Sequence, residues 1–539
     1  PAGATGSPQQ AKHTVKGVVE DALGPIAGAN VVEKGTTNGT ITDMDGNFTL
    51  DGVKNGDVIQ ISFIGYSTME LTYTGKPVGV IKLAEDTQKL DEVVVTALGI
   101  KREKKALGYA TQELKGDELV NARESNIANA LSGKVSGLQV VRSSSGPGGS
   151  SKIVLRGNNS LTGSNQPLIV VDGIPMDNFT GGVDDAWGNS GVDMGNGLSD
   201  INPEDIESMS VLTGAAAAAL YGSHAANGAI VITTKKGKEG KLSVQFSSSS
   251  EFSKAYMTPE FQNTYGNKKD MYESWGEKLL TPTSYDPKKD FFNTGTNFIN
   301  SVTLTTGTKS NQTFASVSST NSKGIVPNNE YDRLNFTIRN TATFLNDKLQ
   351  LDLGASYVKQ KDKNMVSQGQ YWNPVMAAYL FPRGEDFDGI KSFEHFDESR
   401  QLPVQYWPVA DPVYASQNPY WTAYRNVATN EKSRYMFNVG LTYNITDWLN
   451  ATARCRMDDT HVLFERKIYA SSDDKFAEGK KGLYGYNNYE DRQEYADFML
   501  NINKQFNDFN ISANLGYSYS NYWSLARGYK GTLLGVTNL

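Results

Sequence analysis

The chain has 539 residues and a formal net charge of −7, with 38% hydrophobic and 21% charged residues. This length predicts several domains, and the acidic balance argues against a nucleic-acid-binding protein. Mean hydropathy is −0.46, and no window approaches the roughly 18 apolar residues of a membrane-spanning helix. The protein is therefore either soluble or a membrane β-barrel, whose alternating strands keep mean hydropathy low. A single cysteine, Cys455, excludes an internal disulfide.

Residues 1–11 are small and polar, and we expect a flexible N-terminus there; in an exported protein the signal peptide would already be absent from this sequence. Residues 12–87 contain short β-prone runs separated by turns such as Asp45-Gly46 and Asn55-Gly56. The expected strands are Thr14–Glu20, Ala29–Gly35, Gly39–Thr42, Asn47–Leu50, Asp57–Ile64, Thr68–Tyr73 and Val78–Leu83. Seven short strands of this kind favour a small β-sandwich.

A further strand-forming peptide follows the sandwich region. It consists of Asp91, Glu92, Val93, Val94, Val95, Thr96 and Ala97. A partner protein can add such a peptide to the edge of its own sheet, because main-chain hydrogen bonds hold an added strand. Its position between two folded regions makes it a candidate attachment site.

Residues 98–238 mix helix, strand and Gly/Asn loop signals. Ala215–Ala219 favours a helix, and Gly222 ends it. The most specific segments are Ile127–Leu131, Ile153–Gly157 (IVLRG), Pro167–Pro175 (PLIVVDGIP), Asp200–Met209 (DINPEDIESM) and Ile230–Lys235 (IVITTK). In order and spacing they resemble the plug domain of TonB-dependent outer-membrane transporters, in particular the SusC-like nutrient importers of Bacteroidetes. Residues 12–87 resemble the carboxypeptidase-regulatory-like domain, through Gly28–Val31 (GANV) and Phe63–Tyr66 (FIGY).

The stretch between Asp177 and Asp200 is loop-like. Its acidic and aromatic side chains are Asp184, Asp185, Trp187 and Asp193. Two interpretations remain open. These residues form a solvated loop that touches a ligand on the outer side of the plug, or Asp184, Asp185 and Asp193 bind a calcium ion through carboxylate oxygens.

From residue 241 to 539 the chain alternates apolar and polar residues, as in Phe437–Ile445 and Leu449–Met457. This pattern places one face of each strand on an apolar medium and the other on water. A soluble antiparallel sheet would show it too. Tight turns at 346–347, 446–447 and 507–508 alternate with long connections at 252–299 and 361–432, which is typical of outer-membrane barrels.

The connection 361–432 is rich in aromatic residues. Tyr371, Trp372, Trp407 and Trp421 are candidate ligand contacts, since exposed aromatic rings stack on sugars or pack against a partner protein. Packing against a partner or within the loop is the alternative that we favour slightly. Catalysis has no support, because the histidines are scattered and no nucleophile–base pair can be assembled. We expect neither an enzyme nor a cofactor.

The fold expected is mainly β: a sandwich (12–87), an α+β plug (98–238) and the N-terminal portion of a transmembrane antiparallel barrel (241–539). The resemblance implies active import of a bulky nutrient across the outer membrane of a Gram-negative bacterium. It also implies that Asp91–Ala97 is the TonB box, that TonB with ExbB–ExbD supplies the energy, and that a SusD-like surface lipoprotein forms a lid. The sandwich and the TonB box would lie on the periplasmic side, and membrane lipid or lipopolysaccharide would surround the barrel.

Oligosaccharide is the expected cargo; an oligopeptide importer and a ligand-sensing receptor are the alternatives. A soluble adhesin is a further class, but the strands are not repeats of one another. Plugged barrels of this kind have about 22 strands, whereas alternation in residues 241–539 indicates about ten or eleven. An open barrel would leave strand edges unpaired in lipid, so we expect further strands from outside this chain.

Overall fold

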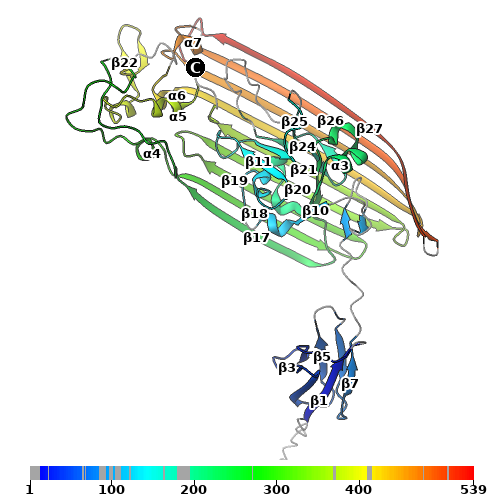
Figure 1. Cartoon of the computed structure of the whole chain (residues 1–539). Helices are drawn as coiled ribbons and strands as arrows, with labels where there is room; N and C mark the ends of the chain where they lie inside the picture. The colour runs from blue at the N-terminus through cyan, green and yellow to red at the C-terminus, as the bar shows by residue number, and fades with distance from the viewer. Residues whose placement is uncertain are drawn as a thin grey trace, which may run out of the picture. The chain divides into compact units, whose positions relative to one another are not determined.

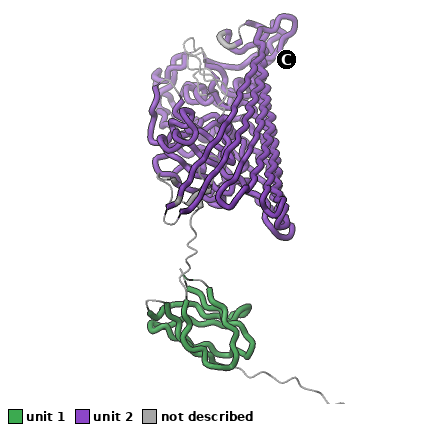
Figure 2. Tube along the Cα trace, turned by 90° about the vertical axis from the view of Figure 1, so that its right-hand side faces the viewer, with its two compact units in different colours: residues 1–93, 103–107 green, residues 94–102, 108–539 purple. Residues whose placement is uncertain are grey.

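The computed structural model (Figure 1) describes residues 13–21, 24–63, 66, 68–83, 93–95, 101–103, 111–120, 123–161, 164–178, 193, 195–269, 271–367, 372–409, 416–477, 479–506 and 509–538. The chain divides into two compact units, residues 1–93 with 103–107 and residues 94–102 with 108–539 (Figure 2). Among the described residues, no helix combines the length and the apolar character needed to span a bilayer.

The first unit is a β-sandwich, and all seven strands expected from the sequence are present. Its strands are β1 (His13–Glu20), β2 (Asn30–Glu33), β3 (Gly39–Ile41), β4 (Asn47–Val53), β5 (Val58–Ser62), β6 (Met69–Thr72) and β7 (Gly79–Lys82). One sheet has the order β4-β1-β7 and the other β3-β2-β5-β6. Alternate residues such as Val19, Phe48 and Ile61 face inward and form the core between the sheets, as the period of two requires.

Two short strands, β8 (Val93–Val95) and β9 (Lys101–Glu103), form a two-stranded sheet. The α+β body that follows is called the plug below. Its helical elements are α1 (Gly116–Val120), α2 (Ile127–Ala130), η3 (Gly197–Asp200), η4 (Pro203–Asp205), α3 (Gly214–Tyr221) and η5 (Gly222–Ala225). Its strands are β10 (Thr111–Lys115), β11 (Leu138–Arg142), β12 (Ser151–Leu155), β13 (Leu168–Val171), β14 (Ile174–Met176), β15 (Ile206–Leu212) and β16 (Ala229–Thr234).

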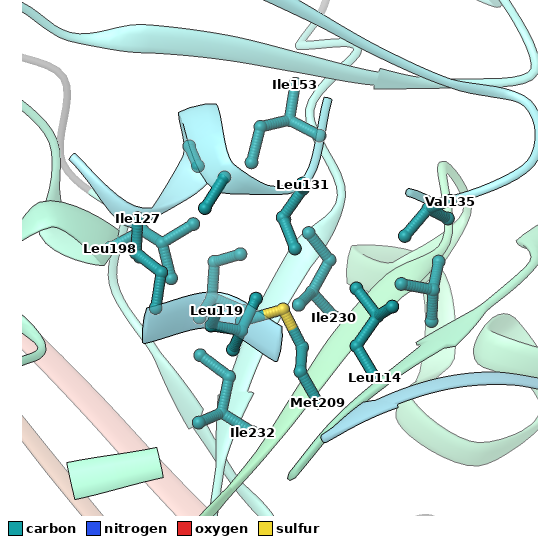
Figure 3. Close-up of a cluster of buried hydrophobic side chains, with 14 of the residues drawn as sticks. Leu114, Leu119, Ile127, Leu131, Val135, Ile153, Leu198, Met209, Ile230 and Ile232 are labelled. Atoms are coloured by element: carbon teal, nitrogen blue, oxygen red, sulfur yellow. The ribbon is translucent and has the colours of Figure 1, made fainter. Parts of the chain in front are cut away.

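The plug is built on a five-stranded sheet with the order β10-β15-β16-β13-β14. Leu114, Leu119, Leu131, Met209 and Ile230 converge from both strands and helices into its buried core (Figure 3). Local chemistry sets the helix ends. The Asn126 side chain accepts a hydrogen bond from the Ala128 backbone N–H at the start of α2, and Gly222, with φ of 74°, ends α3.

Beside the plug lies a nine-stranded antiparallel sheet, called the wall below. Its strands are β17 (Gly240–Ser253), β18 (Gly295–Gly307), β19 (Asn311–Lys323), β20 (Glu330–Phe344), β21 (Leu349–Lys363), β24 (Asn426–Thr446), β25 (Leu449–Tyr469), β26 (Gly482–Phe506) and β27 (Phe509–Thr532). They pair in sequence order, and β17 and β27 are the two edges of an open sheet. The plug lies against one face of this curved sheet (Figure 1).

The register matches the alternation in the sequence. Val439 is paired with Cys455, and both side chains are exposed on the face away from the plug. Arg454, one residue away, points the other way and donates a hydrogen bond to the Asp172 carbonyl oxygen of the plug at 3.4 Å. The polar face of the wall therefore meets the plug, as expected for Arg454 and Arg456, whose side chains are each no more than 9% exposed.

The strands of the wall differ from the expectation in two respects. From Gly240 onward the described residues contain eleven strands, in agreement with the ten or eleven expected. However, β22 (Glu394–Asp397) and β23 (Leu402–Gln405) form a separate hairpin, so not all of these strands belong to the wall, which has nine. The wall strands are also longer than expected: β24 and β25 have 21 residues each and β26 has 25. Outside the apolar stretch of each strand the outward-facing side chains are polar. The alternation of apolar and polar residues therefore stops there, although the backbone hydrogen bonds between neighbouring strands continue.

Residues 361–432 are not a simple loop. Lys361–Lys363 belongs to β21 and Asn426–Lys432 to β24. The described residues between them, together with those of the 252–295 and 470–481 connections, form a folded body at one end of the wall, called the loop end below. Its helical elements are α4 (Pro287–Asp290), α5 (Pro374–Tyr379), η6 (Gly389–Lys391), α6 (Pro419–Arg425) and α7 (Asp474–Ala477). Phe291, Phe381 and Ile390 are no more than 2% exposed in its core.

The register makes a labelling prediction. Single cysteines at positions 439, 454 and 515, in a Cys455→Ser background, should react differently with a lipid-soluble maleimide in the bilayer. Val439 and Leu515 are 46% and 72% exposed on the outward face, so both should be labelled, whereas position 454 should not. Labelling at 454 but not at 515 would contradict the register.

Candidate functional site at the plug–wall interface

A buried ionic cluster joins the plug to the wall at η3. The carboxylate of Asp200 lies 2.6 Å from Lys432 Nζ and 2.8 Å from Arg434 Nη1. Both cations come from β24, at alternate positions on its inward face. Arg434 also forms a two-bond contact with Asp458 of β25, at 2.8 and 2.6 Å. The side chains of Asp200, Lys432 and Arg434 are at most 4% exposed, so this cluster is shielded from water.

The electrostatics favour an ionised Asp200. Burial alone would raise its pKa, but the positive charges and hydrogen bonds of Lys432 and Arg434 hold the pKa of Asp200 below its ordinary value. Buried ion pairs are strongly destabilised when one partner is removed, because the remaining charge has lost its hydration without compensation. If η3 moved away from the wall, Lys432 would lose the Asp200 carboxylate, and its charge would remain uncompensated until water entered the space.

A second ionic cluster joins the ends of the plug strands β13 and β16 to the wall. Arg339 of β20 lies 2.9 Å from Asp172, which follows β13, and 2.8 Å from Asp352 on β21. Arg339 also donates to the Thr234 hydroxyl at the end of β16. Lys236, just after β16, pairs with Asp352 at 2.9 Å. The wall arginine thus bridges two plug strands to an acid of its own sheet.

Other wall side chains bind the plug backbone. Arg333 donates to the carbonyl oxygens of Ser125, at 3.0 Å, and Ser199. Asn335 donates to the Asp200 carbonyl oxygen at 2.6 Å. Among the described residues no carboxylate lies within ion-pair distance of Arg333, and its Nη1 atom donates to carbonyl groups of the plug instead. These contacts between the plug and the wall are therefore polar, unlike those within the hydrophobic core of the plug.

Asp205 of η4 is buried differently from Asp200. Its carboxylate accepts a hydrogen bond from the Asn202 side chain at 3.1 Å, and it is 4% exposed. Burial raises the pKa of Asp205 to about 6, and hydrogen bonds and the more distant charge of Lys235 offset only part of this effect. The plug thus contains one acid held ionised by cations and one whose ionisation is disfavoured.

The structure places the expected ligand residues apart. Asp184, Asp185, Trp187 and Tyr371 lie outside the described residues. Asp193 accepts hydrogen bonds from Ser150 N and Gly195 N, so its carboxylate closes a plug loop. Within the described ranges, no group of three or more potential metal ligands is present.

Three tryptophans of the loop end, Trp372, Trp407 and Trp421, differ in burial. Trp421 is 0% exposed, and its indole N–H donates to Ser472, so its ring packs within the loop body. This is the alternative that the sequence favoured, and Trp421 is no longer a candidate ligand contact. Trp407 is partly buried beside Phe381, with ring centroids 5.8 Å apart. Trp372 packs partly buried beside Ile468 of β25.

Of the strand peptide at 91–97, Val93–Val95 is β8; Asp91, Glu92, Thr96 and Ala97 lie outside the described residues. Sequence reasoning did not identify Asp200, Lys432 and Arg434 as a cluster. One signal existed, because Lys432 and Arg434 share the inward parity of Asn438 and Gly440 on the same strand. The partner on the plug cannot be deduced from periodicity.

Comparison with known proteins agrees with this architecture. Residues 103–229 match the TonB-dependent receptor plug domain, and residues 15–95 match the CarboxypepD_reg-like domain. The TonB-dependent receptor SusC of Bacteroides thetaiotaomicron is 32% identical over 527 residues, which cover 92% of this chain and 49% of that protein. This chain thus contains a TonB-dependent receptor plug domain and is a homologue of SusC. It spans about half the length of that relative.

Further relatives are consistent with this assignment. The TonB-dependent receptor P39 of Formosa agariphila is 37% identical over 246 residues, which cover 45% of this chain and 22% of P39. The fold is similar to that of the RagAB peptide importer in its open-open state, with a TM-score of 0.62, 20% identity, and coverage of 82% of this chain and 50% of that chain. The ferric citrate transporter FecA has a TM-score of 0.50 at 10% identity, covering 83% and 53% of the two chains. These relatives are receptors and transporters, not enzymes.

Replacing Asp200 by Asn should loosen the plug from the wall. Lys432 and Arg434 would lose the plug carboxylate, at a cost of about 3–5 kcal/mol. In the full-length protein in detergent, we expect hydrogen exchange of the η3 backbone amides to accelerate by about 100-fold or more. Asp117→Asn, at an exposed plug position, is the matched control and should leave exchange unchanged. Equal protection in both variants would show that the cluster does not hold η3.

Asp205→Asn should change the pH dependence of plug stability. Because the folded pKa of about 6 exceeds the ordinary 3.8, wild-type stability should fall as pH rises from about 4 to 6. The variant lacks this component, so its stability relative to wild type should increase over the same window, by an amount on the order of 3 kcal/mol. Denaturant unfolding of the plug at several pH values measures the difference, and a pH-independent difference would refute the assignment.

Proposed function

We propose that this chain is part of a TonB-dependent importer that carries a bulky nutrient across the outer membrane. The observation that carries the proposal is a folded plug bound by buried ion pairs to the polar face of a long antiparallel sheet. A body placed in this way closes the lumen at rest. Its polar contacts permit it to shift when energy is supplied, and passage of cargo follows that shift.

The opposite face of the wall supports a position in the membrane. Its exposed side chains include Phe437, Val439, Leu441, Tyr443 and Ile445, each 40–46% exposed. This row on β24 covers a length that corresponds to the roughly 9–11 residues of a membrane-crossing strand. A soluble sheet would expose a contiguous apolar band of this kind to water, which is unfavourable, whereas lipid accommodates it.

The peptide Asp91–Ala97 is the proposed TonB box. The described part of it is a strand, Val93–Val95, and strand addition to the edge of a TonB sheet would transmit a pull into the plug. TonB with ExbB–ExbD is the proposed energy source. In this arrangement the first unit and the TonB box face the periplasm, and the loop end faces the cell exterior.

A SusD-like surface lipoprotein is the proposed lid at the loop end. The folded body there offers a rigid platform, since its core residues Phe381 and Ile390 are no more than 1% exposed. Oligosaccharide is the proposed cargo, with oligopeptide as the alternative. Candidate contacts are Asp184, Asp185, Trp187, Asp193, Tyr371, Trp372 and Trp407.

A proline at the centre of the TonB box tests energy coupling. Val94→Pro removes a backbone donor from the added strand, and deletion of Asp91–Ala97 removes the whole strand. In cells that express the full-length protein, accumulation of a labelled oligosaccharide or oligopeptide taken from a panel should fall to the level seen with a protonophore. Surface binding and barrel assembly should be retained.

Val94→Ile is the matched control, because it keeps both the donor and the β-branched side chain. It should accumulate cargo at the wild-type rate. Accumulation of cargo at the wild-type rate in the deletion variant would show that Asp91–Ala97 is not the TonB box.

A further inference from the structure

Among the residues that the structure describes, one arginine on the inward face of the wall has no acidic partner. Arg466 lies on β25, eight positions toward the loop end from Asp458, and shares its parity. It therefore projects into the proposed lumen beyond the plug contacts. No ion pair and no hydrogen bond of Arg466 occurs among the described residues.

Other inward arginines of the wall are paired differently. Arg434 binds Asp200 and Asp458, Arg454 binds Asp497, and Arg339 binds Asp172 and Asp352. A guanidinium group remains charged at any physiological pH, so a partly buried one without a counterion is costly to maintain. Among the described residues Arg333 also lacks an acidic partner, but it donates to two carbonyl groups of the plug. Arg466 has no such acceptor there, and this difference requires an explanation.

Two aromatic rings fix the guanidinium group of Arg466. Its Cζ atom lies 5.0 Å from the centroid of Trp372 and 5.5 Å from that of Phe464. Trp372 is itself held against the buried cluster that contains Ile468 and Leu483. Cation–π contacts of this kind stabilise the cation and restrict its orientation, while the N–H groups at the edge of the plane remain available for a hydrogen-bond acceptor.

The neighbouring strands leave this position uncrowded. Arg466 is paired with Ala428 on β24 and Gly485 on β26. The three atoms nearest to a methyl group built on Gly485 would be the Tyr529 carbonyl oxygen, at 3.4 Å, and Lys530 Cγ and Cβ, at 3.5 and 3.6 Å. The two side chains that flank Arg466 across the sheet are therefore the smallest possible, and a group entering from the lumen can approach its N–H edge.

We propose that Arg466 binds a carboxylate group of the cargo, so that the imported oligomer is acidic. A planar carboxylate accepts two parallel N–H bonds from a guanidinium group, and it supplies the counterion that the wall lacks here. Trp372 and Phe464 position the cation. This inference rests on the proposed function, because it assigns a substrate class to the same lumen.

Binding of matched probes to the full-length protein in detergent tests the proposal. The sugar pair is tetragalacturonate and its full methyl ester, and the peptide pair is tetraglutamate and tetraglutamine, both with amidated C-termini so that the neutral members carry no carboxylate. Wild type should bind the acidic member of one pair more tightly than its neutral member. Arg466→Gln should weaken that binding by about 10- to 100-fold and leave the neutral probe unchanged.

Arg466→Lys keeps the charge but not the two-bond geometry, and should give an intermediate loss. Arg527→Gln is the matched control, since Arg527 is exposed on the outward face of β27 and should not affect binding. Preference within the sugar pair identifies an acidic oligosaccharide, and preference within the peptide pair an acidic oligopeptide.

Three outcomes overturn the proposal: no preference for either acidic probe, unchanged binding in Arg466→Gln, or equal losses for charged and neutral probes, which would indicate a packing role only. Energised uptake is measured in parallel in cells. If neutral cargo accumulates normally in wild type while Arg466→Gln has no effect on acidic probes, the anion site fails and the import function stands. If nothing accumulates in an energy-dependent manner, the import function itself fails.

Discussion

The shared carboxylate of Asp200 is the interaction on which the plug–wall arrangement depends. It pairs with both Lys432 and Arg434, and Asp458 supplies a second negative charge to Arg434. These cations lie on a strand whose opposite face carries the apolar row from Phe437 to Ile445. A single strand thus has one face suited to lipid and one suited to a charged partner. If the plug were held by apolar packing, the inward face would have to be apolar too, and the lumen could not be hydrated during transport.

The division of charge across the interface follows a simple rule. The wall supplies most cations, and the plug supplies Asp172 and Asp200 together with backbone carbonyl oxygens. Contacts made by short, directional bonds lose their energy over a small displacement, whereas apolar contacts resist separation over the whole buried area. Such an interface is stable while its contacts are formed and loses its stabilisation over a short displacement. The cost of exposing its charges falls as water enters.

Much of this fold can be predicted from the sequence because apolar and polar residues alternate regularly along its strands. The seven sandwich strands, α3 and the register around Val439 and Arg454 all follow from alternation, helix propensity and turn residues. The strand lengths and the folded loop end do not, because the outward side chains turn polar at Ser433 while the backbone ladder continues. The burial of Trp421 depends on a contact with Ser472, 51 residues away, and the pairing of Asp200 with Lys432 joins residues 232 positions apart. Neither contact can be deduced from the local pattern of a single sequence.

The central claim is that the plug must leave the Asp200 contact for cargo to pass. Cysteines at positions 200 and 432, in a Cys455→Ser background, bridged by a short bifunctional methanethiosulfonate reagent, test this claim most directly. Energised uptake by the full-length protein should stop when the bridge forms and return when a reductant cleaves it, with the single-cysteine variants unaffected by the reagent. Undiminished uptake with the bridge fully formed would contradict the account.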